Sequence, residues 1–284
     1  MIDLDDNIVK SLSKNISDAN KNKSIYWKEK AKTIDTEKLY GGTWYGSYTK
    51  KTYKSYLRNT LQYFLYDKKI FKTSTFKKIK SYCNTINREI DFDILRHIFT
   101  FDYLIKYFNK KNLNINSICV IGDGKANSVL CSLKLFKNIK IYSVNLPEVL
   151  IADYKLIKKL KIVENKFIHA VDDINENIQD EKKLIMVPCN KKDYLKNKNI
   201  DLFMDMASMQ EMTDDEIASY FKIINNNKSF FYCCNRKEKK LNNIETTRFY
   251  NYPWKSASII LDDYCEWHNK YVTIWPPFFN FRKN

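Results

Sequence analysis

The feature that most constrains the fold of this chain is the stretch 117–128, SICVIGDGKANS. An apolar run at 118–121 is long enough for a buried parallel strand and too short for a helix. The run breaks at Gly122-Asp123-Gly124, and a helical pattern of apolar residues follows at 129–135. Glycines in such a turn let the backbone reverse sharply, and they let a ligand approach main-chain N–H groups without meeting a Cβ. A strand, a two-glycine turn and a helix therefore predict the opening unit of a nucleotide-type α/β domain.

The residues after this turn alternate between strand-like and helix-like patterns. Apolar runs of strand length occupy residues 140–144, 184–187, 200–206 and 229–234, with a shorter run at 167–171. A helix is expected at 148–161, and another after Thr213, which forms a capping-box pattern with Glu216. Two late runs, 258–261 and 271–274, have no clear helix between them and predict a hairpin. We therefore predict a Rossmann-like α/β fold, with a mostly parallel seven-stranded sheet and an antiparallel hairpin at one edge.

The first part of the chain has a different pattern. Residues 1–40 are polar and lysine-rich, which suggests a helical or partly ordered arm, and we expect activity to survive deletion of residues 1–20. Residues 51–108 carry apolar side chains at helical spacing, with Asp93 as the expected cap of a helix in which His97 is a core or rim residue rather than a ligand. The linker-like run 109–116, NKKNLNIN, divides a helical cap region, 1–112, from the α/β domain, 113–284.

Within the cap region, between residues 1–40 and 51–108, lies a loop rich in glycine and aromatic residues. Three of the five glycines of the chain fall in residues 40–46, YGGTWYG. Such a loop can cover a ligand pocket, with Trp44 and Tyr45 as contact surfaces for a substrate, or it can be a structural turn. Both interpretations stay open at the level of sequence.

Composition narrows the classes of partner. The formal net charge is +16, but the lysines are spread along the whole chain, so a basic solvated surface is expected and nucleic acid is not. The seven cysteines show no metal-ligand spacing and are expected to be reduced thiols of a cytoplasmic protein without a metal site. No apolar run is long enough for a membrane span.

The residues at the predicted strand ends resemble the cofactor site of class I S-adenosylmethionine-dependent methyltransferases. The resemblance implies that Gly122, Asp123 and Gly124 hold the methionine part of the cofactor and that S-adenosylhomocysteine is the product. It further implies that Asn145, with Leu146, binds the ribose, and that Cys189 and Asn190 contact adenine. The resemblance also places Asp205 among the residues that bind the cofactor. An acidic residue is common at position 145, and asparagine lacks the charge-assisted hydrogen bond of a carboxylate.

A narrower resemblance comes from four segments: VNLPEVL (144–150), DLFMDMASMQEM (201–212), FYCCNR (231–236) and YPW (252–254). They look like the sugar O-methyltransferase family of bacterial surface-polysaccharide clusters. The resemblance implies an enzyme that methylates a hydroxyl of a sugar or sugar-nucleotide acceptor during capsule or lipopolysaccharide biosynthesis. A homodimer is the expected assembly.

An O-methyltransferase aligns the acceptor hydroxyl with an activated methyl group, and a base that takes the hydroxyl proton adds about 10²–10⁴-fold. Gln210 and Glu211 follow the strand expected beside the methyl group, so Gln210 is expected to orient the hydroxyl and Glu211 to act as base or sugar ligand. A helix-start carboxylate is the structural alternative for Glu211. His169 and His268 are rival bases. The expected acceptor ligands are Ser208, Asn235 and Arg236.

Four other functions compete with this interpretation. A methyltransferase could act on a non-sugar anionic molecule of the same pathway. A nicotinamide-dependent oxidoreductase would want a third glycine at position 127 and an acid near 145, and both are missing. A nucleic-acid amino-methyltransferase would carry an Asn/Asp-Pro-Pro-aromatic motif where this chain has Asp205-Met206-Ala207-Ser208. A binding module without enzymatic activity is the fourth.

Overall fold

The fold was analysed in a computed structural model of the chain. The structure describes residues 6–24, 27–28, 53, 60, 63–64, 68–173, 183–241, 245–256, 258–262, 265, 267, 272–275 and 278–281. The chain forms two compact units: unit 1 contains residues 1–36, 115–132 and 138–260, and unit 2 contains residues 37–114, 133–137 and 261–284. The described N-terminal residues, 6–24 and 27–28, thus belong to the unit that contains the sheet, whereas the sequence pattern grouped them with the helical region.

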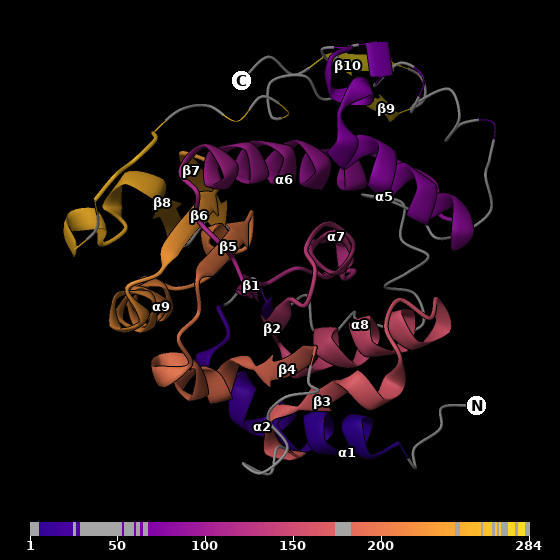
Figure 1. Cartoon of the computed structure of the whole chain (residues 1–284). Helices are drawn as coiled ribbons and strands as arrows, with labels where there is room; N and C mark the ends of the chain where they lie inside the picture. The colour runs from indigo at the N-terminus through magenta and orange to yellow at the C-terminus, as the bar shows by residue number, and fades with distance from the viewer. Residues whose placement is uncertain are drawn as a thin grey trace. The chain divides into compact units, whose positions relative to one another are not determined.

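The core of unit 1 is a six-stranded sheet in which every pair of neighbours is parallel (Figure 1). Its order is β3-β4-β2-β1-β5-β6. The strands are β1 (Ser117–Ile121), β2 (Lys140–Asn145), β3 (Ile168–Ala170), β4 (Leu184–Pro188), β5 (Leu202–Met206) and β6 (Phe230–Cys234). The strand order reverses between β1 and β5, and in open parallel sheets this switch point is where ligands bind, beyond the carboxyl ends of the strands.

Helices cover both faces of this sheet (Figure 1). They are α7 (Asn127–Leu135) and α8 (Pro147–Lys159) on one side and α9 (Asp214–Asn227) on the other. All residues of β1, β4 and β5 are buried, as expected for strands covered twice. Cys119, Ile121 and Phe203 belong to the hydrophobic cluster that contains Ile217 and Tyr220 of α9. Beyond the N-terminal arm, the described 3-10 helices of this unit are η4 (Asn165–Phe167), η5 (Val171–Asp173), η6 (Cys189–Asn197), η7 (Met209–Glu211), η8 (Phe249–Asn251) and η9 (Trp254–Ser256).

The N-terminal arm of unit 1, described over residues 6–24 and 27–28, contains α1 (Asn7–Lys14), α2 (Ile16–Ala19) and η1 (Asn20–Asn22). Leu12 and Ala19 of the arm are fully buried. The Tyr154 hydroxyl and the Lys158 ammonium, both on α8, donate to the Asp6 carboxylate at 2.6 and 2.8 Å. The arm is therefore a packed element of the α/β unit.

Unit 2 contains η3 (Ile70–Lys72), α5 (Ser74–Thr85), α6 (Phe92–Lys110) and the hairpin of β9 (Val272–Trp275) and β10 (Phe278–Phe281). The expected cap of α6 was wrong by two residues. Asp91 accepts the hydrogen bond from Ile94 N at 3.0 Å, while Asp93 lies in the first turn and pairs with Arg96. His97 is buried in this helix, as expected for a core residue, and its burial and the Arg96 guanidinium lower its pKa to about 3.

Two details of the predicted sheet were wrong. Among the described residues the parallel sheet has six strands rather than seven, and it carries no antiparallel edge strand. Residues 258–261 are irregular, with Ile259 and Ile260 exposed, and β9 pairs with β10 instead. A second separate hairpin, β7 (Glu238–Leu241) with β8 (Glu245–Arg248), follows β6. Hairpins form between close neighbours in sequence because a short loop loses little entropy on closing.

Candidate functional site

The turn after β1 has an unusual backbone. Gly122 and Gly124 have φ angles of +68° and +46°, and Lys125 and Ala126 follow with +79° and +53°. Two non-glycine residues in succession in the left-handed region are strained, since each conformation costs about 1–2 kcal/mol. Such strain clusters at ligand-binding sites, where the surrounding structure holds it in place. The turn therefore marks the carboxyl edge of the sheet as the candidate site.

The two glycines serve different purposes. A methyl group placed on Gly122 would lie 1.8 Å from the Ser208 Oγ and 2.4 Å from the Ser208 Cβ, so Gly122 permits the loop after β5 to lie against the loop after β1. A methyl group on Gly124 would meet no atom within 4 Å. The surface above Gly124 is thus open to a ligand, whereas the space beside Gly122 is filled by the protein.

Two carboxyl groups take the N–H groups of this turn. Asp123 accepts from Ser128 N and Val129 N, at 2.9 and 3.0 Å, in the first turn of α7. Asp153 of α8 accepts from Lys125 N at 2.7 Å, and also from Ala126 N. Burial and the nearby Asp123 carboxylate raise the pKa of Asp153. Asp123, expected at the cofactor, thus has its carboxylate directed to the start of α7.

The ends of β2 and β4 lie side by side, because Asn145 is in register with Pro188. The Asn145 side-chain oxygen accepts from Leu146 N at 2.9 Å, and no described residue contacts its amide nitrogen by a hydrogen bond. Pro147 then begins α8, and Cys189 and Asn190 begin η6. Burial raises the pKa of the Cys189 thiol to about 11, which makes it an inert thiol at neutral pH.

The N-terminal arm contacts this edge at three points. Asn190 donates its side-chain amide to Asn15 Oδ1 at 2.9 Å, and Lys23 forms an ion pair with Glu148 at the start of α8. Ser24 Oγ donates to the Glu211 carbonyl oxygen at 2.7 Å. The arm therefore runs along the residues that end β2, β4 and β5.

Asp205, expected at the cofactor, is fully buried at the end of β5. Its carboxylate accepts from Met209 N at 3.0 Å and from the side chain of Asn235, and the Cys233 thiol donates to it at 3.6 Å. Burial raises its pKa to about 6, although these hydrogen bonds act in the opposite direction. Asp205 therefore shapes the turn at Ala207, whose φ is +65°, and holds Asn235 rather than presenting a free carboxylate.

Gln210 is joined to the end of β6. Its side-chain oxygen accepts from Arg236 N at 2.9 Å, and its own N–H donates to Asn235 Oδ1 at 3.4 Å. Gln210 is 5% exposed, and the –NH₂ end of its side chain has no hydrogen-bond partner among the described residues. The structure thus brings together Ser208, Gln210, Asn235 and Arg236 at the edge where the sequence placed them.

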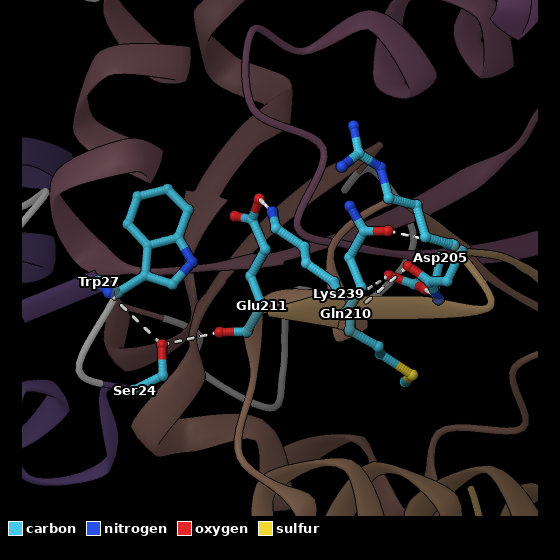
Figure 2. Close-up of polar contacts among 9 residues, drawn as sticks. Ser24, Trp27, Asp205, Gln210, Glu211 and Lys239 are labelled. Atoms are coloured by element: carbon cyan, nitrogen blue, oxygen red, sulfur yellow. Dashed lines mark hydrogen bonds and ion pairs between the residues drawn. The ribbon is translucent and has the colours of Figure 1, made fainter. Parts of the chain in front are cut away.

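Glu211 has two partners that the sequence did not indicate. Its carboxylate forms an ion pair with Lys239 of β7, and both side chains are about 15% exposed. Figure 2 shows this pair together with Ser24 and Trp27. The Ser24 hydroxyl donates to the Glu211 carbonyl oxygen and accepts from the backbone N–H of Trp27 at 3.4 Å. The helix-start alternative for Glu211 receives no support, because Thr213 caps α9 and the first turn of that helix holds other carboxylates. Glu216 was expected to complete the capping box, but its carboxylate pairs with Lys192 at 2.8 Å.

His169 does not reach this turn. It lies on β3, four strands away from β5, and neighbouring strands are about 4.8 Å apart, so about 19 Å separates the two strands. Trp44, Tyr45 and His268 lie outside the described residues. Within the described part of the chain, no group of three His, Cys, Asp or Glu side chains could hold a metal ion.

Comparison of the sequence with protein-family models and with curated proteins found no match. None of the helices in the described segments is both long and apolar enough to cross a bilayer. The structure shows an α/β protein whose described strands form a parallel six-stranded sheet and two small antiparallel hairpins.

Proposed function

We propose that this chain is an S-adenosylmethionine-dependent O-methyltransferase that modifies a hydroxyl of a sugar or sugar-containing precursor in bacterial surface-polysaccharide biosynthesis. The cofactor would lie over Gly124, with Asn145 at the ribose and the Cys189–Asn190 turn at the base. When bound, it supplies a methyl group already activated by a positive sulfonium.

The observation that carries the proposal is that the N–H groups of the glycine turn and of the start of α7 donate to carboxyl groups of the protein itself. A dinucleotide places its pyrophosphate on the N–H groups at the start of the helix that follows such a turn. Here Asp123 accepts from Ser128 N and Val129 N, and Asp153 accepts from Lys125 N. A pyrophosphate would lose these donors and meet the Asp123 carboxylate. A ligand with a positive sulfonium and ammonium is favoured by the same charge.

The acceptor side of the proposal rests on the turn after β5. Gln210 is held by Arg236 N and directs its –NH₂ end away from that contact, so it can hydrogen-bond an acceptor hydroxyl. Glu211 is held by Lys239 and by Ser24, and its carboxylate can accept the hydroxyl proton or a hydrogen bond from the sugar. These groups act by alignment and by proton acceptance, which are the two demands of methyl transfer to oxygen.

Cofactor binding is tested by calorimetry with S-adenosylmethionine and with NAD. We expect the wild-type chain to bind the first and not the second. Gly124→Val should abolish binding by placing a branched side chain over the turn, and circular dichroism should show that the variant stays folded. Asn145→Asp should retain or tighten binding. NAD binding at the turn would contradict the proposal.

The role of Glu211 is tested by Glu211→Gln, with mass spectrometry of candidate acceptors after incubation with labelled cofactor. If Glu211 is the base, turnover should fall by about 10²-fold or more while cofactor affinity is kept. If Glu211 only binds the sugar, the loss should appear mainly in KM. Unchanged kinetics in a folded variant would remove Glu211 from the mechanism.

A further inference from the structure

The ion pair between Glu211 and Lys239 joins two elements of the candidate site. Glu211 lies in η7 and Lys239 in β7, and each side chain keeps about 15% of its surface exposed. The two charged side chains are therefore largely shielded from solvent but keep part of their surface exposed. An ammonium next to a carboxylate offers hydrogen-bond donors and acceptors side by side.

Trp27 is brought to this pair by the N-terminal arm. Ser24 Oγ accepts from the Trp27 backbone N–H and donates to the Glu211 carbonyl oxygen, so Ser24 links the backbone of Trp27 to η7. In Figure 2 the Trp27 indole lies on one side of the Glu211 side chain, and Lys239 lies on the other. The anchor of this segment is Lys23, whose side chain is 1% exposed and pairs with Glu148.

These three side chains match the two kinds of surface of a sugar ring. Neighbouring hydroxyls can donate to a carboxylate and accept from an ammonium at the same time. The C–H face of a pyranose is apolar, and an indole provides a flat apolar surface with little loss of conformational entropy. A phosphate fits less well, because the Glu211 carboxylate already compensates the Lys239 charge.

We propose that Trp27, Glu211 and Lys239 form the acceptor subsite, in which the indole stacks on a neutral pyranose ring and the ion pair binds two adjacent hydroxyls. This inference rests on the proposed function, which it extends by naming the ring face and the hydroxyl pattern of the acceptor. It also gives the N-terminal arm a role in the site, because Trp27 follows residues 1–20, the part of the arm whose deletion is expected to leave activity intact.

The test is saturation-transfer NMR with methyl α-glucopyranoside as the probe and 2-methoxytetrahydropyran, which keeps the ring but lacks the hydroxyls, as the control probe. We expect the glucoside to bind the wild-type chain and the control probe to bind at least tenfold more weakly. Trp27→Ala and Lys239→Met should each weaken glucoside binding at least tenfold. Trp27→Phe and Lys239→Arg keep the aromatic face and the charge, and they should retain most of it.

Two exposed residues provide matched controls. Lys240→Met removes the neighbouring ammonium on β7, and Tyr250→Ala removes an exposed aromatic ring, and both should leave glucoside binding unchanged. Glucoside binding that survives both Trp27→Ala and Lys239→Met, or that is absent from the wild-type chain, would overturn the subsite. Calorimetry with S-adenosylmethionine on the same proteins separates the two proposals. If the wild-type chain does not bind S-adenosylmethionine, the proposed cofactor is refuted, while the NMR experiment still decides whether the sugar subsite exists.

Discussion

The contrast between the two glycines of the β1 turn leads to a quantitative prediction. Alanine at Gly122 adopts a positive φ, which costs about 1–2 kcal/mol, and its methyl group would also overlap the Ser208 side chain at 1.8 Å. Overpacking of this kind typically adds about 1–3 kcal/mol. Alanine at Gly124 meets no atom within 4 Å and incurs the backbone term alone. We therefore expect Gly122→Ala to reduce the free energy of unfolding by about 2–5 kcal/mol and Gly124→Ala by about 1–2 kcal/mol.

Urea denaturation followed by circular dichroism measures both values. The decisive comparison is the double variant Gly122→Ala/Ser208→Gly, in which the overlapping side chain is removed. If the overlap is real, this variant should be more stable than the sum of its two single changes predicts. The reason is that Ser208→Gly removes the side chain that the alanine methyl group at position 122 would overlap. Equal losses for Gly122→Ala and Gly124→Ala, together with additive behaviour of the double variant, would refute the close approach of the two loops.

Three further predictions concern stability. Leu12→Ala should lower the free energy of unfolding by about 2–5 kcal/mol, because this arm residue is fully buried, while the exposed Lys14→Ala should change it little. Equal effects of the two substitutions would contradict the packing of the arm on the α/β unit. Because the pKa of Asp205 is raised to about 6 in the folded chain, folding takes up a proton between pH 4 and 6, so this group's contribution to stability falls as pH rises through that window, by about 3 kcal/mol. The difference in free energy of unfolding between the wild type and Asp205→Asn, measured by urea denaturation at several pH values, should fall as pH rises from 4 to 6. A difference that does not change with pH would contradict the prediction. His97 acts in the opposite sense, because its pKa is lowered to about 3: the unfolded chain takes up the proton, so stability falls as pH drops below about 6.5. The wild type should lose stability there faster than His97→Gln, and parallel pH profiles would contradict the assignment.

Much of the α/β unit could be predicted from local sequence. The strands of the sheet were recognised because a strand covered on both faces must be apolar at nearly every position, as β1 and β4 are. The cap of α9 was recognised for a similar reason: Thr213 bonds to an N–H group only three residues away. The turn at Gly122-Asp123-Gly124 was recognised because glycine adopts a positive φ without steric cost, and both of its glycines do so.

The site residues were predicted only as far as strand ends define them. Gln210 and Arg236 were expected at the same edge, and the structure joins them by a hydrogen bond. Their neighbour Asp205 was expected to face a ligand, yet it is buried and bonded to the turn that follows. A polar residue at a strand end has the same local pattern in both cases, so only its three-dimensional partners distinguish the two roles.

The sequence by itself determined which segments become buried strands and where the chain must turn, since burial and backbone torsion act over a few residues. The tertiary structure alone decided which distant residues meet. It placed Ser208 on Gly122, paired Lys239 with Glu211, and laid the arm residue Ser24 against the same turn. These contacts join residues 28 to 187 positions apart, and they form because folding carries them to one edge of the sheet. A lysine in a basic chain or a serine in a polar arm has no local pattern that predicts such a partner, because its choice of partner follows from the packing of the whole unit.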